Sequence, residues 1–190
     1  MRPYLERHGR NVHCLNLMPN NGDAGLDELA QQIVAYVECS FSTGETIDLV
    51  GFSMGGLVAR YYVQRLGGLQ RVRRFITISS PHNGTCTAFL RWNKGARQMR
   101  PGSSFLRDLN RDVEVLGRIG FTSIWTPFDL MIVPAHSSVL HAGRTMRVNV
   151  AAHPLMVRNP QVLKLVLDAL AAGREEINPS PTKETSRPSI

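Results

Sequence analysis

One motif constrains the fold of this chain more than any other feature of its sequence: GFSMGG at residues 51–56. It fits G-x-S-x-G, a pattern in which the serine sits on a sharp turn between a buried strand and a helix. The flanking sequence agrees, because the apolar run 47–52 precedes the turn and an apolar stretch with helical spacing follows it. We expect neighbouring backbone to pass so close to Gly51 and Gly55 that neither has room for a side chain. The motif predicts Ser53 as a nucleophile at a helix N-terminus.

Strand-like and helix-like segments alternate along the chain. Short apolar runs predict strands at residues 12–17, 47–52, 75–79, 121–125 and 146–150. Apolar residues at helical spacing predict helices over residues 26–37, 57–66 and 162–170. This alternation is typical of a layered α/β domain with parallel strands. We expect the domain to span residues 1–177, with one or two helices within 86–118 that form a small cap or insertion, and a disordered polar tail at 178–190.

A nucleophilic serine needs a base, and the base needs an acid that orients it. After this kind of turn the acid comes first in the chain and the histidine second, each in a loop that follows a later strand. Asp129 and His153 occupy such loops, whereas His136 and His141 precede the last predicted strand. A simple turn hydrogen bond at Asp129, or an ordinary surface or core position for His153, is the alternative. The backbone N–H of Met54 would be one oxyanion donor.

Around the motif, in IDLVGFSMGGLVARYYV and FITISSPHNGT, the sequence resembles the lipase and esterase branch of the α/β-hydrolase superfamily. It is similar there to small bacterial triacylglycerol lipases. The stretches TSIWTPFDLMIVP and VNVAAHPLMVRNPQVLKLV resemble the acid and histidine loops of those enzymes. The resemblance implies a three-layer α/β-hydrolase-type sandwich with a mainly parallel sheet and a Ser53–Asp129–His153 triad. It also implies cleavage of acyl esters through an acyl-enzyme, with no metal and no organic cofactor.

The segment SPHNGT at residues 80–85 resembles a loop that these enzymes carry after the strand that follows the serine helix. His82 and Asn83 would then line the site. A plain turn with Asn-Gly chemistry accounts for the two residues as well.

The chain departs from the family at its start. Family members begin with a strand that ends in a His-Gly loop, and that loop supplies a second oxyanion donor. No strand precedes His8-Gly9, which instead resembles the end of the family's first helix. We therefore expect an N-terminally incomplete sheet and the loss of a donor worth about 2.7–4 kcal/mol to the transition state. Such a chain is either a fragment or a short form with weak or no activity.

Composition limits the other function classes. The net charge is +7, but the basic residues are scattered apart from Arg71, Arg73 and Arg74, and no nucleic-acid motif accompanies them. This pattern predicts a solvated basic surface and no nucleic-acid partner. The three cysteines lack the spacing of a metal site. The N-terminal sequence lacks the apolar stretch of a signal peptide, and no apolar run is long enough to span a membrane, so we expect the chain as given to be cytoplasmic.

The leading hypothesis is a lipase-like or carboxylesterase-like serine hydrolase whose substrate is a small acyl ester or a lipid. We expect transient contact with a lipid surface, and the sequence leaves the oligomeric state open. Phe105 and Leu106 would bind the acyl chain within the cap, or pack in the core. The alternatives are a non-catalytic or weakly active binding domain, and an acyl hydrolase or transferase that acts on amides or thioesters.

Overall fold

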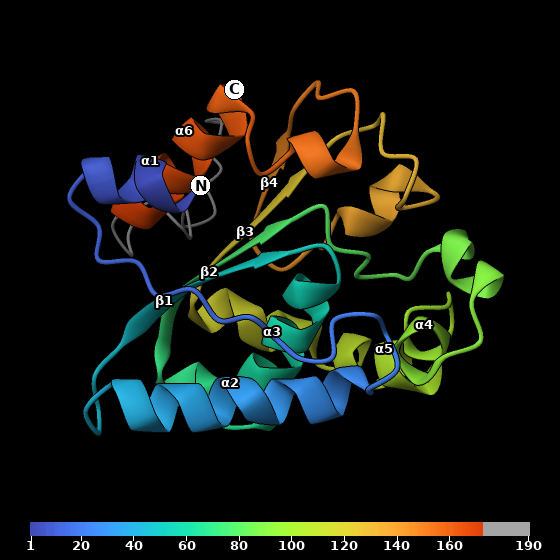
Figure 1. Ribbon diagram of the computed structural model, residues 1–190, viewed down its shortest axis with the longest axis horizontal. Helices are drawn as coiled ribbons and strands as arrows, with labels where there is room; N and C mark the ends of the chain where they lie inside the picture. The colour runs from blue at the N-terminus through green and yellow to red at the C-terminus, as the bar shows by residue number, and fades with distance from the viewer. Residues whose placement is uncertain (173–190) are drawn as a thin grey trace, which may run out of the picture.

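The computed structural model of the protein describes residues 1–172. Its centre is a four-stranded sheet in the order β1-β2-β3-β4, and every neighbouring pair is parallel (Figure 1). The strands are β1 (Ile47–Phe52), β2 (Val72–Ile78), β3 (Gly120–Trp125) and β4 (Arg144–Arg147). Long crossover connections join consecutive strands, as parallel pairing requires, with α-helices between β1 and β2 and between β2 and β3, and a single 3₁₀ turn between β3 and β4. The predicted α/β fold with a parallel sheet is confirmed.

Helices cover both faces of the sheet, which gives three layers (Figure 1). One face packs against α2 (Leu26–Ser40) and α3 (Met54–Arg65), and the other against α1 (Arg2–Arg7) and α6 (Pro160–Ala171). Successive strand residues point to opposite faces. Phe75 of β2 therefore joins the core under α2 and α3, while Ile76 joins the core under α1 and α6.

The long connection between β2 and β3 holds two short helices, α4 (Lys94–Gln98) and α5 (Ser104–Asn110). The 3₁₀ turns are η1 (Gly68–Gln70), η2 (Cys86–Leu90), η3 (Val113–Arg118), η4 (Ala135–Ser138) and η5 (His153–Leu155). Phe105 and Leu106 of α5 are buried in the core shared with α2 and α3. Of the two uses expected for these side chains, the structure shows core packing.

The predicted strand at residues 12–17 is wrong. This segment leaves α1 on one face of the sheet and reaches α2 on the other, and it has no strand pairing (Figure 1). Only Val12 and Leu17 are partly covered. His13 packs against the rings of Tyr36 and Phe41 instead of entering a sheet. With so little burial, side-chain packing does not favour a strand here.

The predicted ends of other elements shift by a few residues. β4 covers residues 144–147 rather than 146–150, and α3 begins at Met54 rather than residue 57. The predicted tail at 178–190, like the last residues of the 1–177 domain, lies outside the described residues. Within residues 1–172, no helix is both long and apolar enough to cross a bilayer.

Candidate active site

Ser53 lies where β1 ends and α3 begins. Its backbone has φ 53° and ψ −127°, a conformation that side-chain-bearing residues rarely adopt. The turn is held on both sides, because the Ser53 N–H donates to the Ile78 carbonyl of β2 at 2.9 Å and the Ser53 carbonyl accepts from Gly56 N–H at 3.0 Å. The turn places Ser53, which is half-buried, immediately before the first N–H groups of α3.

The glycines around Ser53 are required at two positions. A Cβ on Gly51 would lie 2.5 Å from the Gly56 Cα, and a Cβ on Gly56 would collide with the Ser80 hydroxyl. Gly55 has no neighbour within 4 Å of such an atom. The expectation for Gly51 is confirmed and the one for Gly55 is wrong. The close approach occurs one residue later, where α3 first faces the end of β2.

Asp129 and His153 meet although 24 residues separate them. His153 Nδ1 lies 2.7 Å from Asp129 Oδ2, and both side chains are buried. Asp129 Oδ1 accepts hydrogen bonds from the backbone N–H groups of Met131 and Ile132, each at 3.0 Å. Burial raises the pKa of Asp129, but the hydrogen bonds from His153 and the backbone outweigh burial, so its pKa lies below the usual 3.8. The carboxylate is ionised at neutral pH and accepts a hydrogen bond from the Nδ1–H group of His153.

The His153 ring is also placed next to the serine turn. It packs on the ring of Phe52, the residue before Ser53, with the ring centroids 4.7 Å apart. Ionised Asp129 assigns the proton to Nδ1, which leaves Nε2 as the free base. No hydrogen bond joins the Ser53 hydroxyl to His153 among the described residues; such contacts often tighten only when substrate binds.

Thr126 is a site residue that the sequence analysis missed. It is buried, donates from Oγ1 to the Val150 carbonyl at 2.8 Å, and accepts from the N–H groups of Phe128 and Val150 at 3.3 Å. These bonds join the loop of Asp129 to the loop of His153. A threonine at a strand end is the only sequence signal for this role.

The remaining candidate residues lie elsewhere. His82 is fully buried, with Nε2 3.0 Å from the Thr77 hydroxyl and its ring edge-on to Phe121. Burial, with Arg60 adding to it, lowers the pKa of His82 well below 6.5, so this ring is a neutral core group. The prediction that His82 lines an open site is wrong, because the chain turns the ring inward beneath α3. Asn83 is exposed and donates to the Val139 carbonyl at 3.2 Å, which fastens two loops.

The rival histidines, His136 and His141, are both exposed. Neither makes an ion pair with a carboxylate in residues 1–172. In that part of the chain, no three histidine, cysteine or acidic residues gather in a way that could hold a metal ion.

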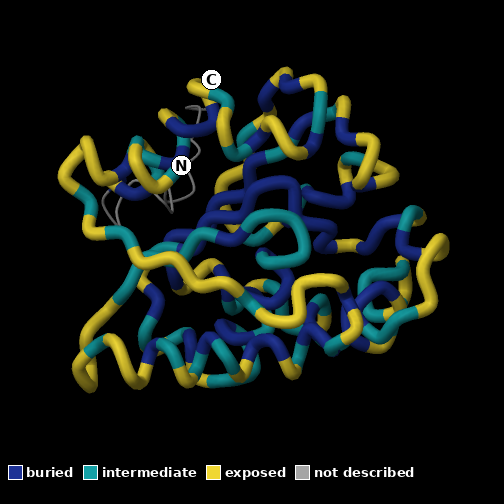
Figure 2. Tube along the Cα trace, in the orientation of Figure 1, coloured by how far each residue is buried: buried dark blue, intermediate teal, exposed yellow. Residues whose placement is uncertain are grey.

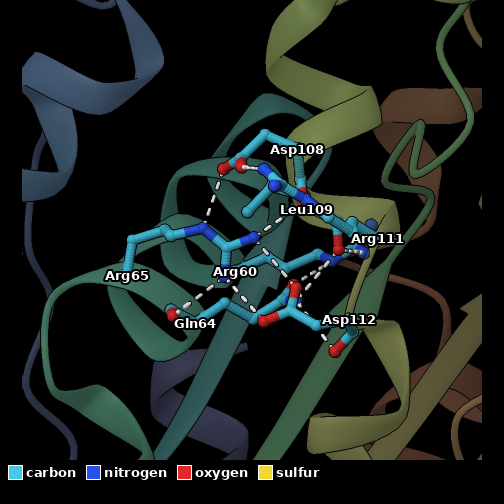
Figure 3. Close-up of polar contacts among 7 residues, drawn as sticks. All are labelled: Arg60, Gln64, Arg65, Asp108, Leu109, Arg111 and Asp112. Carbon is cyan, nitrogen blue, oxygen red and sulfur yellow. Dashed lines mark hydrogen bonds and ion pairs between the residues drawn. The ribbon is translucent and has the colours of Figure 1, made fainter.

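A polar cluster anchors α3, the helix that begins at the serine turn (Figure 3). Arg65 binds Asp108 at 2.7 Å and Asp112 at 2.9 Å, both at the end of α5 and just beyond it. Arg60 donates to the Leu109 carbonyl at 2.7 Å, and burial lowers its pKa to about 9 although the charge of Asp112 opposes this. These contacts fix the helix on which the Ser53 turn depends.

Three comparisons relate the chain to known proteins. The family model described as palmitoyl protein thioesterase matches residues 4–99, slightly more than half of the chain. Triacylglycerol lipases from Pseudarthrobacter phenanthrenivorans and Burkholderia plantarii are each 36% identical over 83 residues, 43% of this chain. The matched region is only 25% and 23% of those lipases, about a quarter of their length.

Solved structures share the fold. Lipase B from Aspergillus fumigatus superposes with a TM-score of 0.68 and 21% identity, over 83% of this chain and 44% of its own. The mature lipase from Bacillus licheniformis gives a TM-score of 0.63 and 13% identity, over 78% of this chain and 75% of its own. At these identities the likeness is one of fold.

Proposed function

The chain belongs to the palmitoyl protein thioesterase family of the α/β hydrolases, and from this membership we propose that it is an acyl hydrolase that uses Ser53 as its nucleophile. The resemblance to the lipase and esterase branch is confirmed by the family model and the lipase relatives. The activity and the substrate are our proposal, since the matched lipases are much longer than this chain.

In the proposed reaction, Ser53 Oγ attacks the carbonyl carbon of an acyl ester while His153 Nε2 takes the hydroxyl proton. Asp129 holds the imidazole in the required tautomer and stabilises the imidazolium that forms. The Met54 N–H, at the first position of α3, donates to the oxyanion. His153 then gives the proton to the leaving alcohol, and a water molecule hydrolyses the acyl-enzyme by the same steps in reverse order.

One observation carries this proposal: a buried Asp–His pair packs on the residue before a strained serine. Each part alone has a structural explanation, since buried histidines often make hydrogen bonds and turns often contain serine. Strain of the kind seen at Ser53 costs on the order of 1–3 kcal/mol and clusters at active sites. Its position next to an oriented imidazole supports a nucleophile rather than a structural turn.

A fluorophosphonate probe tests the proposal. It labels serines that an adjacent base activates, so we expect labelling of the intact chain and none of Ser53→Ala. Ser104→Ala is the matched control, because Ser104 is an exposed serine that begins α5. Absence of labelling in a chain that is folded by circular dichroism would contradict the proposal and favour a non-catalytic domain.

The family match favours a second candidate, a thioester as the scissile bond. The same site would cleave it, because Ser53 would attack the carbonyl carbon in both cases, whether oxygen or sulfur leaves. Palmitoyl esters of an alcohol and of a thiol, which share one acyl chain, separate the two. A kcat/KM at least about tenfold higher for the thiol ester, equal to about 1.4 kcal/mol, would assign the thioester.

A further inference from the structure

A cavity of about 260 Å³ lies where the loop of His153 meets the start of α6. It is lined by six residues, namely Asn149, Val150, Ala151, Leu155, Arg158 and Asn159. Exposed and buried residues follow one another from 149 to 156, so this loop has one side in solvent and the other against the core (Figure 2). None of the lining residues takes part in the proposed reaction.

Hydrogen bonds hold the walls of the cavity in place. Val150 is fixed through both of its backbone groups, because its carbonyl accepts from the Thr126 hydroxyl at 2.8 Å and its N–H donates to the same oxygen at 3.3 Å. The Leu155 carbonyl accepts from the N–H groups of Arg158 and Asn159, at 3.0 and 2.9 Å. The cavity is therefore preformed, which lowers the free-energy cost of ordering it around a ligand.

The polar lining residues offer hydrogen-bond donors, and none of them is a carboxylate. Asn159 Oδ1 accepts from the N–H groups of Gln161 and Val162, at 2.9 and 3.3 Å, which leaves the Asn159 NH₂ group as a donor. None of the ion pairs within residues 1–172 involves Arg158. The sequence has no Asp or Glu from residue 130 to 167, so no acidic side chain of the surrounding loop competes for this guanidinium.

These features match an anion that has a single charge and an apolar chain. A guanidinium binds a carboxylate through two parallel N–H···O bonds, and neighbouring amides add further donors. One cation balances the single charge of a carboxylate, whereas a phosphate ester carries a charge of about −2. Val150, Ala151 and Leu155 make the remainder of the lining apolar, and methylene groups gain free energy when they are buried against such side chains.

We propose that this cavity binds an aliphatic monocarboxylate, with the carboxylate on Arg158 and the chain on Val150 and Leu155. Ala151 and Leu155 lie two residues to either side of His153, so a bound ligand contacts the loop that positions this imidazole. The carboxylic acid that the proposed hydrolase releases has this chemistry, and its binding would regulate the site from outside the reacting groups. Only this regulation rests on the proposed function; the binding itself does not require catalysis.

An NMR titration of the isotopically labelled protein with hexanoate tests the binding. We expect chemical-shift changes at the backbone amides of Ala151 and Leu155 and at the side-chain NH₂ groups of Asn149 and Asn159, with a dissociation constant on the order of 1 mM. Hexanamide has the same chain without the charge and should bind at least about tenfold more weakly. Acetate has the charge without most of the chain and should also bind at least about tenfold more weakly.

Variants separate the charge from the shape of the cavity. Arg158→Gln removes the charge and should weaken hexanoate binding about tenfold. The matched control is Arg118→Gln, because Arg118 is likewise exposed and lies in η3, outside the cavity. Ala151→Leu keeps the charge but narrows the cavity, and it should weaken hexanoate binding as well.

Kinetics separates the two sources of a carboxylate. If the reaction product regulates the site, added hexanoate should lower kcat for p-nitrophenyl hexanoate without raising KM, and this effect should be lost in Arg158→Gln. Binding without a kinetic effect would assign the cavity to a carboxylate from outside the reaction. Binding by a chain that a fluorophosphonate does not label would leave the cavity assigned and refute the hydrolase.

Three results would overturn the proposal. The first is a titration in which hexanoate shifts none of the cavity resonances. The second is an equal loss of binding in Arg118→Gln and Arg158→Gln, which would indicate a general effect of charge. The third is a set of shifts confined to the amides of Met54 and Gly55, which would place the carboxylate at the serine turn instead.

Discussion

Replacing Asp129 with asparagine tests the central contact of the proposed site. The side chains have nearly the same shape, but asparagine has one oxygen where aspartate has two. Oδ1 of Asp129 accepts from the Met131 and Ile132 N–H groups, and Oδ2 accepts from His153. If the asparagine oxygen keeps the two backbone bonds, its NH₂ group faces His153 Nδ1. The imidazole must then protonate Nε2, and it can no longer accept the Ser53 proton.

The expected loss follows from this tautomer change. An asparagine in the same role lowers kcat by about 10⁴-fold, which corresponds to about 5.5 kcal/mol of transition-state stabilisation. KM should change little, because Asp129 is buried behind the imidazole. The assay is hydrolysis of a p-nitrophenyl acyl ester by the wild type, Asp129→Asn and Ser53→Ala. Asp168→Asn is the matched control, since Asp168 is an exposed carboxylate paired with Lys164 on α6.

The fold must survive for the result to be informative. Asparagine preserves the volume and one acceptor, so Asp129→Asn should unfold cooperatively in urea, although at a lower midpoint. A folded Asp129→Asn protein with activity within tenfold of the wild type would refute the assignment. The orienting acid would then have to be sought elsewhere, and the Asp129–His153 contact would be structural.

Three further predictions concern stability. Gly56→Ala should destabilise the fold by about 1–3 kcal/mol because the new Cβ collides with Ser80, whereas Gly55→Ala should be neutral or stabilise α3 by up to about 1 kcal/mol. Urea unfolding of both variants measures the difference, and equal effects would contradict the packing described at Gly56. Arg65→Ala should cost about 1 kcal/mol, because its partners are partly exposed, and the loss should shrink in high salt. Because the pKa of Asp129 is lower in the folded protein than its value of about 3.8 in the unfolded chain, this carboxylate stabilises the fold at pH values above 3.8, and the contribution should disappear as the pH falls through the folded pKa. Acid titration of the wild type and of Asp129→Asn should show their unfolding free energies converging below pH 3.8.

The sheet was largely predictable because its central strands are short, apolar and bounded by turn residues. The run 47–52 matches β1, and the runs at 75–79 and 121–125 fall within three residues of β2 and β3 at either end. β4 was displaced because Arg144 and Arg147 pair through their backbones at the edge of the sheet, where side-chain polarity matters little. Val148 and Val150 are buried in the core although they lie beyond the strand, so their apolar character misplaced it.

The failure at residues 12–17 has a different cause. An apolar run indicates that side chains can be buried, but a strand also needs a partner for its backbone. In the described chain β1 pairs with β2 alone, and the segment at 12–17 has no strand pairing. Periodicity contains no information about whether a partner is present, so no reading of this segment by itself could have distinguished strand from coil.

Part of the site could likewise be predicted from local sequence, and part depends on contacts between segments that are distant in the chain. Chain order located Asp129 and His153, because parallel strands put the loops that follow them at one edge of the sheet. Other features of the site depend on how separate loops meet. They are the contact of His153 with Phe52, the two hydrogen bonds between Thr126 and the Val150 backbone, and the close approach of Ser80 that leaves no room for a side chain at Gly56. A sequence motif can therefore name the proposed reacting groups of this protein, whereas their alignment is set by residues that carry no motif. Variants of Thr126 and Gly56 should accordingly affect the site through the positions of His153 and Ser53, although neither residue touches a reacting atom in the proposed mechanism.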